Sequence, residues 1–154
     1  MHEKFGCKVG LKSPAHITLI PPFWIHEEKE QQLIADINAI SLSAQPFTLA
    51  TKNFSAFKPR TIYVDVVVNE KLRSLKADID KFFSETDYKI KIESRPFHPH
   101  ITIATRDLYK KDFHEAWTAF ETKKFKAEWE ATALSLLRHN SINWDVIHTS
   151  AFKK

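Results

Sequence analysis

The sequence PAHITL at residues 14–19 and the sequence PHITI at residues 99–103 are two copies of one short pattern. In an extended strand, alternate side chains face the same way. Each copy therefore places a histidine and a threonine on one face and aliphatic side chains on the other. Two imidazoles that titrate near neutral pH, each beside a hydroxyl donor, suit a metal-free reaction at a phosphodiester. These candidate catalytic residues are His16, Thr18, His100 and Thr102.

The segments that follow the two copies come in the same order. Each copy precedes a helical pattern, a long strand pattern that begins with phenylalanine, and a strand with an aromatic residue. Tyr63 follows His16 at nearly the separation at which Trp144 follows His100. Such similar spacing indicates two copies of one unit, with the two His-x-Thr strands facing each other across a cleft. The expected organisation is one domain over residues 1–154 with pseudo-repeats at about 7–68 and 88–150.

Hydrophobic periodicity and turn residues predict the remaining elements. Asn69 is the expected N-cap of the middle helix. The expected helices are Glu27–Ile40, Glu70–Ser84 and Asp112–Glu121. The expected strands are Cys7–Leu11, His16–Ile20, Phe47–Phe57, Thr61–Val68, Tyr88–Glu93, Phe125–Arg138 and Ile142–His148. By the symmetry of the repeat, about one strand and one helix would be missing before Met1, and the exposed strand edge would favour dimerisation or strand swapping.

Composition limits the function classes. The net charge of +4 and the sequence pI near 9.1 favour an anionic substrate, but the dense lysine and arginine runs of a nucleic-acid coating protein are absent. The single cysteine, Cys7, excludes a disulfide within the chain and fits a reducing compartment. The apolar stretches are too short to span a bilayer, and no charged-then-apolar leader precedes the first motif. We therefore expect a cytoplasmic protein without a membrane partner.

The two intact motifs, their separation and the repeated layout resemble the 2H phosphoesterase superfamily, in particular the 2′-5′ RNA ligase-like proteins, also called RNA 2′,3′-cyclic phosphodiesterases. Residues 16–19 and 100–103 both match the H-x-T-hydrophobic pattern, and residues 12–16 and 97–100 match the flanks seen there. The resemblance covers nearly the whole chain, although the first strand and helix of the family pattern are absent. It implies an α+β, bilobal, duplicated fold with two antiparallel sheets facing a central cleft and helices outside.

The same resemblance implies the reaction. Members open 2′,3′-cyclic phosphates without a metal, and some join RNA by a reversible 2′-5′ ligation. By carry-over, His16 is the proton donor and His100 the acceptor, and the two exchange roles when the reaction reverses. The implied partner is an RNA end or a nucleotide with a cyclic phosphate, and no cofactor is implied.

Further side chains are candidates for substrate binding. Arg60 and Arg106 suit a phosphate, with an ordinary surface role as the alternative. Tyr63, Phe23 and Trp144 suit stacking on a base, with core packing as the alternative.

Two other functions stay open at this point. The pair His98 and His100, with His16, has donors for zinc, which would make the protein a metal-dependent hydrolase. Neither motif contains a carboxylate and Cys7 has no cysteine partner, so we expect no metal and assign His98 to the cleft rim. The second alternative is a non-catalytic module that holds an RNA end or a nucleotide in the same cleft. The intact histidines and threonines favour catalysis, because a binder needs no matched acid and base.

Overall fold

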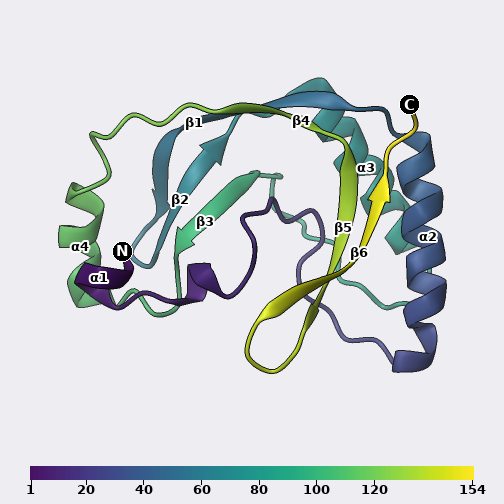
Figure 1. Ribbon diagram of the computed structural model, residues 1–154, viewed down its shortest axis with the longest axis horizontal. Helices are drawn as coiled ribbons and strands as arrows, with labels where there is room; N and C mark the ends of the chain where they lie inside the picture. The colour runs from purple at the N-terminus through teal and green to yellow at the C-terminus, as the bar shows by residue number, and fades with distance from the viewer.

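The computed structural model describes residues 1–154 and has an α+β fold (Figure 1). The helices are α1 (His2–Phe5), α2 (Glu30–Ser43), α3 (Glu70–Ser84) and α4 (Lys110–Thr118), with 3₁₀ turns η1 (Val9–Leu11) and η2 (Glu27–Lys29). The strands are β1 (Phe47–Phe57), β2 (Thr61–Val66), β3 (His100–Ala104), β4 (Glu128–Ala131), β5 (Ala133–His139) and β6 (Trp144–Ala151). None of the helices combines the length and the apolar character needed to cross a membrane.

The strands form two antiparallel sheets. One has the order β3-β2-β1-β4, and the other is the hairpin β5-β6. Helix α2 lies on the outer side of the hairpin, and the chain between η1 and α2 passes between the two sheets (Figure 1). The predicted arrangement of two antiparallel sheets with helices outside is confirmed. The edge strand β3 borders the space through which that chain passes, which brings the two motif segments into one region.

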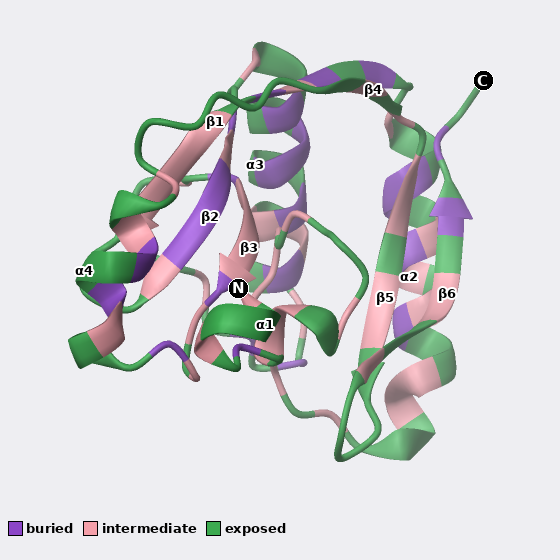
Figure 2. Cartoon of the chain, turned by 60° about the vertical axis from the view of Figure 1, so that its left-hand side comes forward, coloured by how far each residue is buried: buried purple, intermediate pink, exposed green.

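Helix α3 forms where local signals agree. The Asn69 side chain accepts a hydrogen bond from the Leu72 N–H at 2.9 Å, so the predicted N-cap is confirmed. The Asn69 amide also donates to the Thr48 carbonyl at 2.8 Å, which fixes the start of the helix to β1. Leucine, isoleucine and phenylalanine side chains recur at helical spacing and are buried. Figure 2 shows buried residues along α3 and along β2, the strand that supports the second motif.

The hydrophobic core has two parts. The larger part joins α2, α3, β1 and the end of β2 with Phe152, which follows β6, and with the segment around Tyr88 and Ile90. The smaller part lies under α4, where Phe113 and Ala116 meet Ile62 of β2 and Ala104 of β3. One face of strands β2 and β3 therefore packs against the larger core at one end and against the smaller core at the other. The opposite face of these strands is left for polar side chains.

Two predicted strands near the N-terminus are wrong. Residues 7–11 form no strand: residues 9–11 are the 3₁₀ turn η1, and the Asp107 carboxylate accepts hydrogen bonds from the N–H groups of Lys8 and Val9 in place of a neighbouring strand. Residues 16–20 are not in a ladder, since β3 pairs with β2 alone and β5 pairs with β6 alone. Prolines on both sides of this segment also remove backbone donors that a ladder would need.

Two further expectations are corrected. Residues 88–93 form no strand, and their alternation serves packing: Tyr88 and Ile90 are buried, and the Tyr88 ring lies against Phe83 of α3. The expected strand Phe125–Arg138 is two strands, because β4 pairs with β1 and the chain then crosses at Thr132 to form the hairpin. Strand β2 ends at Val66, β6 begins at Trp144, and α2 and α4 differ from their predicted bounds by a few residues at each end.

Candidate active site

The second motif lies on β3, beside the central strand β2. In the antiparallel register, His100 lies opposite Asp65 and Thr102 opposite Tyr63. Side chains of directly opposed residues project to the same face of a sheet. Ile101 projects to the other face and packs against the larger core. The sheet thus presents an imidazole, two hydroxyls and a carboxylate together.

Aromatic rings surround the His100 imidazole. The Phe57 ring meets it edge-on with centroids 5.1 Å apart, and the Tyr63 ring lies 5.0 Å away. These rings come from the end of β1 and the middle of β2, two strands that a short turn connects. Half-burial against two rings restricts the rotamers of His100, which is useful for a group that transfers protons.

A backbone carbonyl sets the tautomer of His100. Its Nδ1 lies 2.8 Å from the carbonyl oxygen of His98. A carbonyl oxygen can only accept, so Nδ1 carries the proton and donates it. The other ring nitrogen, Nε2, is then the one that is free to take up or release a proton in a reaction.

The first motif repeats this local geometry. The Nδ1 of His16 lies 2.7 Å from the carbonyl oxygen of Pro14, again two residues earlier. His16 and Thr18 are exposed, while Ile17 and Leu19 pack against the larger core. The predicted alternation of side chains is therefore present, although no strand ladder produces it.

Three contacts hold the first motif near the second. Gly10 lies so close to β3 that a Cβ atom there would be 2.4 Å from the carbonyl oxygen of Ile103. Two residues later, the Lys12 carbonyl accepts a hydrogen bond of 2.7 Å from the N–H of Trp144 on β6. The chain therefore crosses from β3 to β6 just before His16 (Figure 1). Ile17 and Ile101 then pack against the same core, so both motifs stand on one hydrophobic base.

His98 and Asp65 join the site, although neither is among the sequence-predicted site residues. The Nε2 of His98 lies 3.0 Å from Oδ1 of Asp65 and 3.2 Å from the Tyr63 hydroxyl. One signal for Asp65 was present in the sequence: it is the single charge within the apolar strand that contains Tyr63, two residues away and so on the same face.

The predicted substrate-binding side chains fall into two groups. Tyr63 is next to His100, but the residue is only 2 % exposed, so its ring is not open to a base. Arg60, in the turn between β1 and β2, and Arg106, after β3, are exposed and form no ion pair. Phe23 is half-buried in the larger core with its ring 6.4 Å from Phe83.

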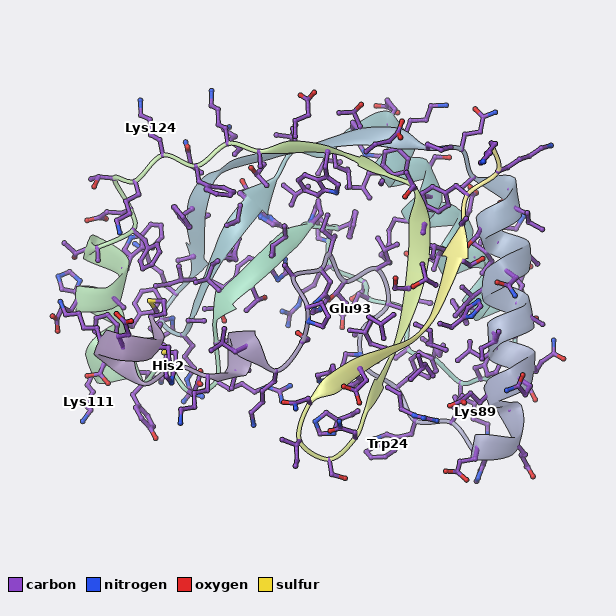
Figure 3. The ribbon with its side chains drawn as sticks, viewed as in Figure 1. His2, Trp24, Lys89, Glu93, Lys111 and Lys124 are labelled. Atoms are coloured by element: carbon purple, nitrogen blue, oxygen red, sulfur yellow. The ribbon has the colours of Figure 1, made fainter.

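Two aromatic side chains near the first motif differ in environment. Trp144 has its ring 5.0 Å from that of His139 in the hairpin. Trp24, which follows Phe23, is 96 % exposed and points away from the fold at the lower edge of Figure 3.

Two hollows of the surface lie away from the motifs. Their volumes are about 350 and about 260 Å³, and both lie where the C-terminal half of α2 approaches α3. No motif residue lines either one. No three histidine, cysteine, aspartate or glutamate side chains are arranged to hold a metal ion.

The chain is similar in sequence to several known bacterial proteins. Curated proteins named as candidate phosphoesterases match from Bacillus pumilus, at 31 % identity over 60 % of this chain and 53 % of the relative, and from Bacillus mycoides, at 27 % identity over 75 % and 64 %. The chain spans about half the length of the Bacillus pumilus relative.

Solved structures show the same fold at low sequence identity. The structure of E. coli LigT complexed with 3′-AMP matches with a TM-score of 0.67 at 20 % identity, covering 91 % of this chain and 78 % of that one. The protein TT0787 of Thermus thermophilus matches with a TM-score of 0.63 at 19 % identity, covering 90 % and 78 %. The family model of the 2′-5′ RNA ligase superfamily matches residues 3–143, both motifs included. The chain therefore belongs to the 2′-5′ RNA ligase superfamily.

Proposed function

We propose that this protein is a metal-independent phosphodiesterase that opens 2′,3′-cyclic phosphates of RNA ends or small nucleotides. One observation carries the proposal: His16 and His100 both donate Nδ1–H to the carbonyl two residues earlier. Both imidazoles therefore keep Nε2 as the nitrogen that exchanges protons. A matched pair of this kind supplies both the base and the acid of an in-line displacement.

In the proposed hydrolysis, neutral Nε2 of His100 takes a proton from water as the water oxygen attacks phosphorus. Protonated Nε2 of His16 gives its proton to the departing ribose oxygen. The cyclic ester becomes a phosphomonoester beside a free hydroxyl, and the protons on the two histidines are exchanged with solvent afterwards. The Thr18 and Thr102 hydroxyls donate to the non-bridging oxygens, where charge is held in the transition state. With a 5′-hydroxyl as the attacking group, the same site would form a 2′-5′ linkage.

The substrate class rests on three supports. The relatives in Bacillus are named as candidate phosphoesterases, and the matched E. coli LigT structure holds 3′-AMP. The net charge of +4 favours an anion. Arg60 and Arg106, both exposed, are proposed as the phosphate-backbone contacts of a longer RNA substrate.

The test is turnover of a nucleoside 2′,3′-cyclic phosphate with EDTA present. His16→Ala and His100→Ala should each lower kcat by about 10²–10⁴-fold. His114→Ala is the matched control, because His114 is exposed on α4, outside both motifs. Activity that disappears with EDTA, or that survives both motif substitutions, would overturn the proposal.

A second candidate function is a module that binds an RNA end or a nucleotide without turnover. The exposure of His16 on a segment without a ladder favours it, because such a segment holds an acid less rigidly than a strand does. Under this alternative, the wild-type protein would bind a nucleoside cyclic phosphate in a titration and leave it intact. The dimer expected from an exposed strand edge stays a prediction, and light scattering would test it.

A further inference from the structure

The His98 side chain is held by two groups of the central strand β2. Its Nε2 lies 3.0 Å from the Asp65 carboxylate and 3.2 Å from the Tyr63 hydroxyl. The Phe57 ring meets the His98 ring edge-on with centroids 5.3 Å apart. His98 is exposed at the end of the segment before β3, yet its ring contacts three residues from β1 and β2.

Hydrogen-bond capacity sets the tautomer of His98. An ionised carboxylate only accepts, so the His98 Nε2 must carry a proton and donate it to Asp65. The Tyr63 hydroxyl lies close enough to share this proton. His98 is thereby fixed with its proton on Nε2, whereas the neighbouring His100 is fixed with its proton on Nδ1.

The backbone of His98 connects this anchor to the candidate catalytic histidine. The His98 carbonyl is the group that accepts the Nδ1–H of His100 at 2.8 Å. Between the two lies Pro99, whose side chain is almost completely buried and whose φ angle is fixed by its ring. The contacts of the ring with Asp65 and Tyr63 therefore tie to β2 the residue whose carbonyl orients His100, and without them the His98 backbone, including this carbonyl, would be held less firmly.

We propose that His98 is a positioning residue: Asp65 and Tyr63 hold its ring, and its carbonyl in turn holds the His100 imidazole in the reactive tautomer and orientation. The kinetic consequence rests on the proposed function, whereas the structural link does not. The first motif has no equivalent, because Pro14 supplies the corresponding carbonyl and its backbone is already restricted by the proline ring.

Kinetics on a nucleoside 2′,3′-cyclic phosphate give the first test. His98→Ala should lower kcat by about 10- to 100-fold, the loss that follows a small misplacement of a catalytic group, with KM changed less than about twofold. His98→Gln, whose side-chain amide can still donate to Asp65, should recover most of that loss. Asp65→Ala should resemble His98→Ala, and the double variant should be no worse than either, because both act through one linkage.

Three kinetic outcomes would overturn the proposal. An unchanged kcat in His98→Ala would remove the positioning role. A raised KM with unchanged kcat would make His98 a direct substrate contact. Equal losses in His98→Gln and His98→Ala would show that the imidazole itself is needed.

A nuclear magnetic resonance experiment decides the structural link without any turnover. Long-range ¹H–¹⁵N spectra of the wild-type protein should show His98 protonated at Nε2 and both His16 and His100 protonated at Nδ1. In His98→Gln, the ring resonances of His100 should shift while those of His16 stay in place. Equal shifts at both histidines, none at His100, or a wild-type His98 with its proton on Nδ1 would overturn the link. If the wild type turns over no cyclic phosphate, the proposed function fails and these spectra still decide the role of His98.

Discussion

The two His-x-Thr segments have the same local hydrogen bond in very different surroundings. His100 is half-buried on β3, between the rings of Phe57 and Tyr63. His16 is exposed on a segment without a ladder, and its ring bonds the Pro14 carbonyl. The tautomer of each histidine is therefore set by its own chain two residues back, whatever the strand pairing. The surrounding sheet adds rigidity, but only to the second motif, which lies on β3.

This contrast predicts how the two halves of the site respond to change. The first motif depends on a few points of attachment, at Gly10 and Lys12 before it and at Ile17 and Leu19 within it. The second depends on β2 and on the His98 linkage. Substitutions that act through one set of contacts should therefore disturb their own motif more than the other.

After the two histidines, the largest effect should come from the two threonines. Thr18→Val and Thr102→Val each remove a hydroxyl donor while keeping a β-branched side chain, and each should lower kcat by about 10²-fold. Turnover of a nucleoside 2′,3′-cyclic phosphate measures it, with Thr118→Val on α4 as the control. A loss in one variant alone would show that the two motifs differ in role as well as in surroundings.

Gly10 offers a way to disturb the attachment of the first motif. In Gly10→Ala the new methyl would lie 2.4 Å from a backbone oxygen of β3, so the chain before His16 must move. Overpacking of this kind costs about 1–3 kcal/mol, and we expect a matching fall in Tm together with a lower kcat. Lys8→Ala, exposed in the same segment, is the control. An unchanged Tm would mean that Gly10 is not a point of attachment.

Local sequence signals predicted what depends on local structure. Helix α3 matches residues 70–84 because its cap and its apolar spacing lie within the segment itself. The four motif residues were predicted as the site because their pattern repeats, and this stays a prediction. The ladder expected for residues 16–20 was wrong, since pairing depends on a neighbour far away in the chain. The grouping of His98 with Asp65 was missed for a similar reason, because it follows from the register between β2 and β3.

Just after the first motif, two adjacent aromatic residues differ in burial: Phe23 packs against the core and Trp24 is exposed. Phe23 packs beside Phe83, so Phe23→Ala should lower the free energy of unfolding by about 2 kcal/mol, less than a fully buried phenylalanine would cost. Trp24 is 96 % exposed, so Trp24→Ala should change it by less than about 0.5 kcal/mol. Denaturant unfolding of both variants measures this. Equal losses of unfolding free energy in the two variants would mean that Phe23 does not anchor this segment to the core.

The smallest effect that we expect is on the pH dependence of stability, and it compares the segments that lead into the two motifs. Each contains a buried acid: burial, aided by the charge of Asp107, raises the pKa of Cys7, and burial together with a hydrogen bond to Asp36 raises the pKa of Tyr88. Both groups hold their protons more tightly when the protein is folded. Their contribution to stability is therefore complete below the pKa of the unfolded chain and is lost as the pH rises above it.

The two losses should begin at different pH values. The part due to Cys7 starts above about pH 8.5 and the part due to Tyr88 above about pH 10, the values for unfolded chains. Cys7→Ala should flatten the first decline in the free energy of unfolding, and Tyr88→Phe the second, in urea titrations between pH 7 and 11. Tyr109→Phe is the control, because Tyr109 is 65 % exposed. The same alkaline decline in Tyr88→Phe and in the wild type would show that Tyr88 does not anchor the segment before the second motif through its proton.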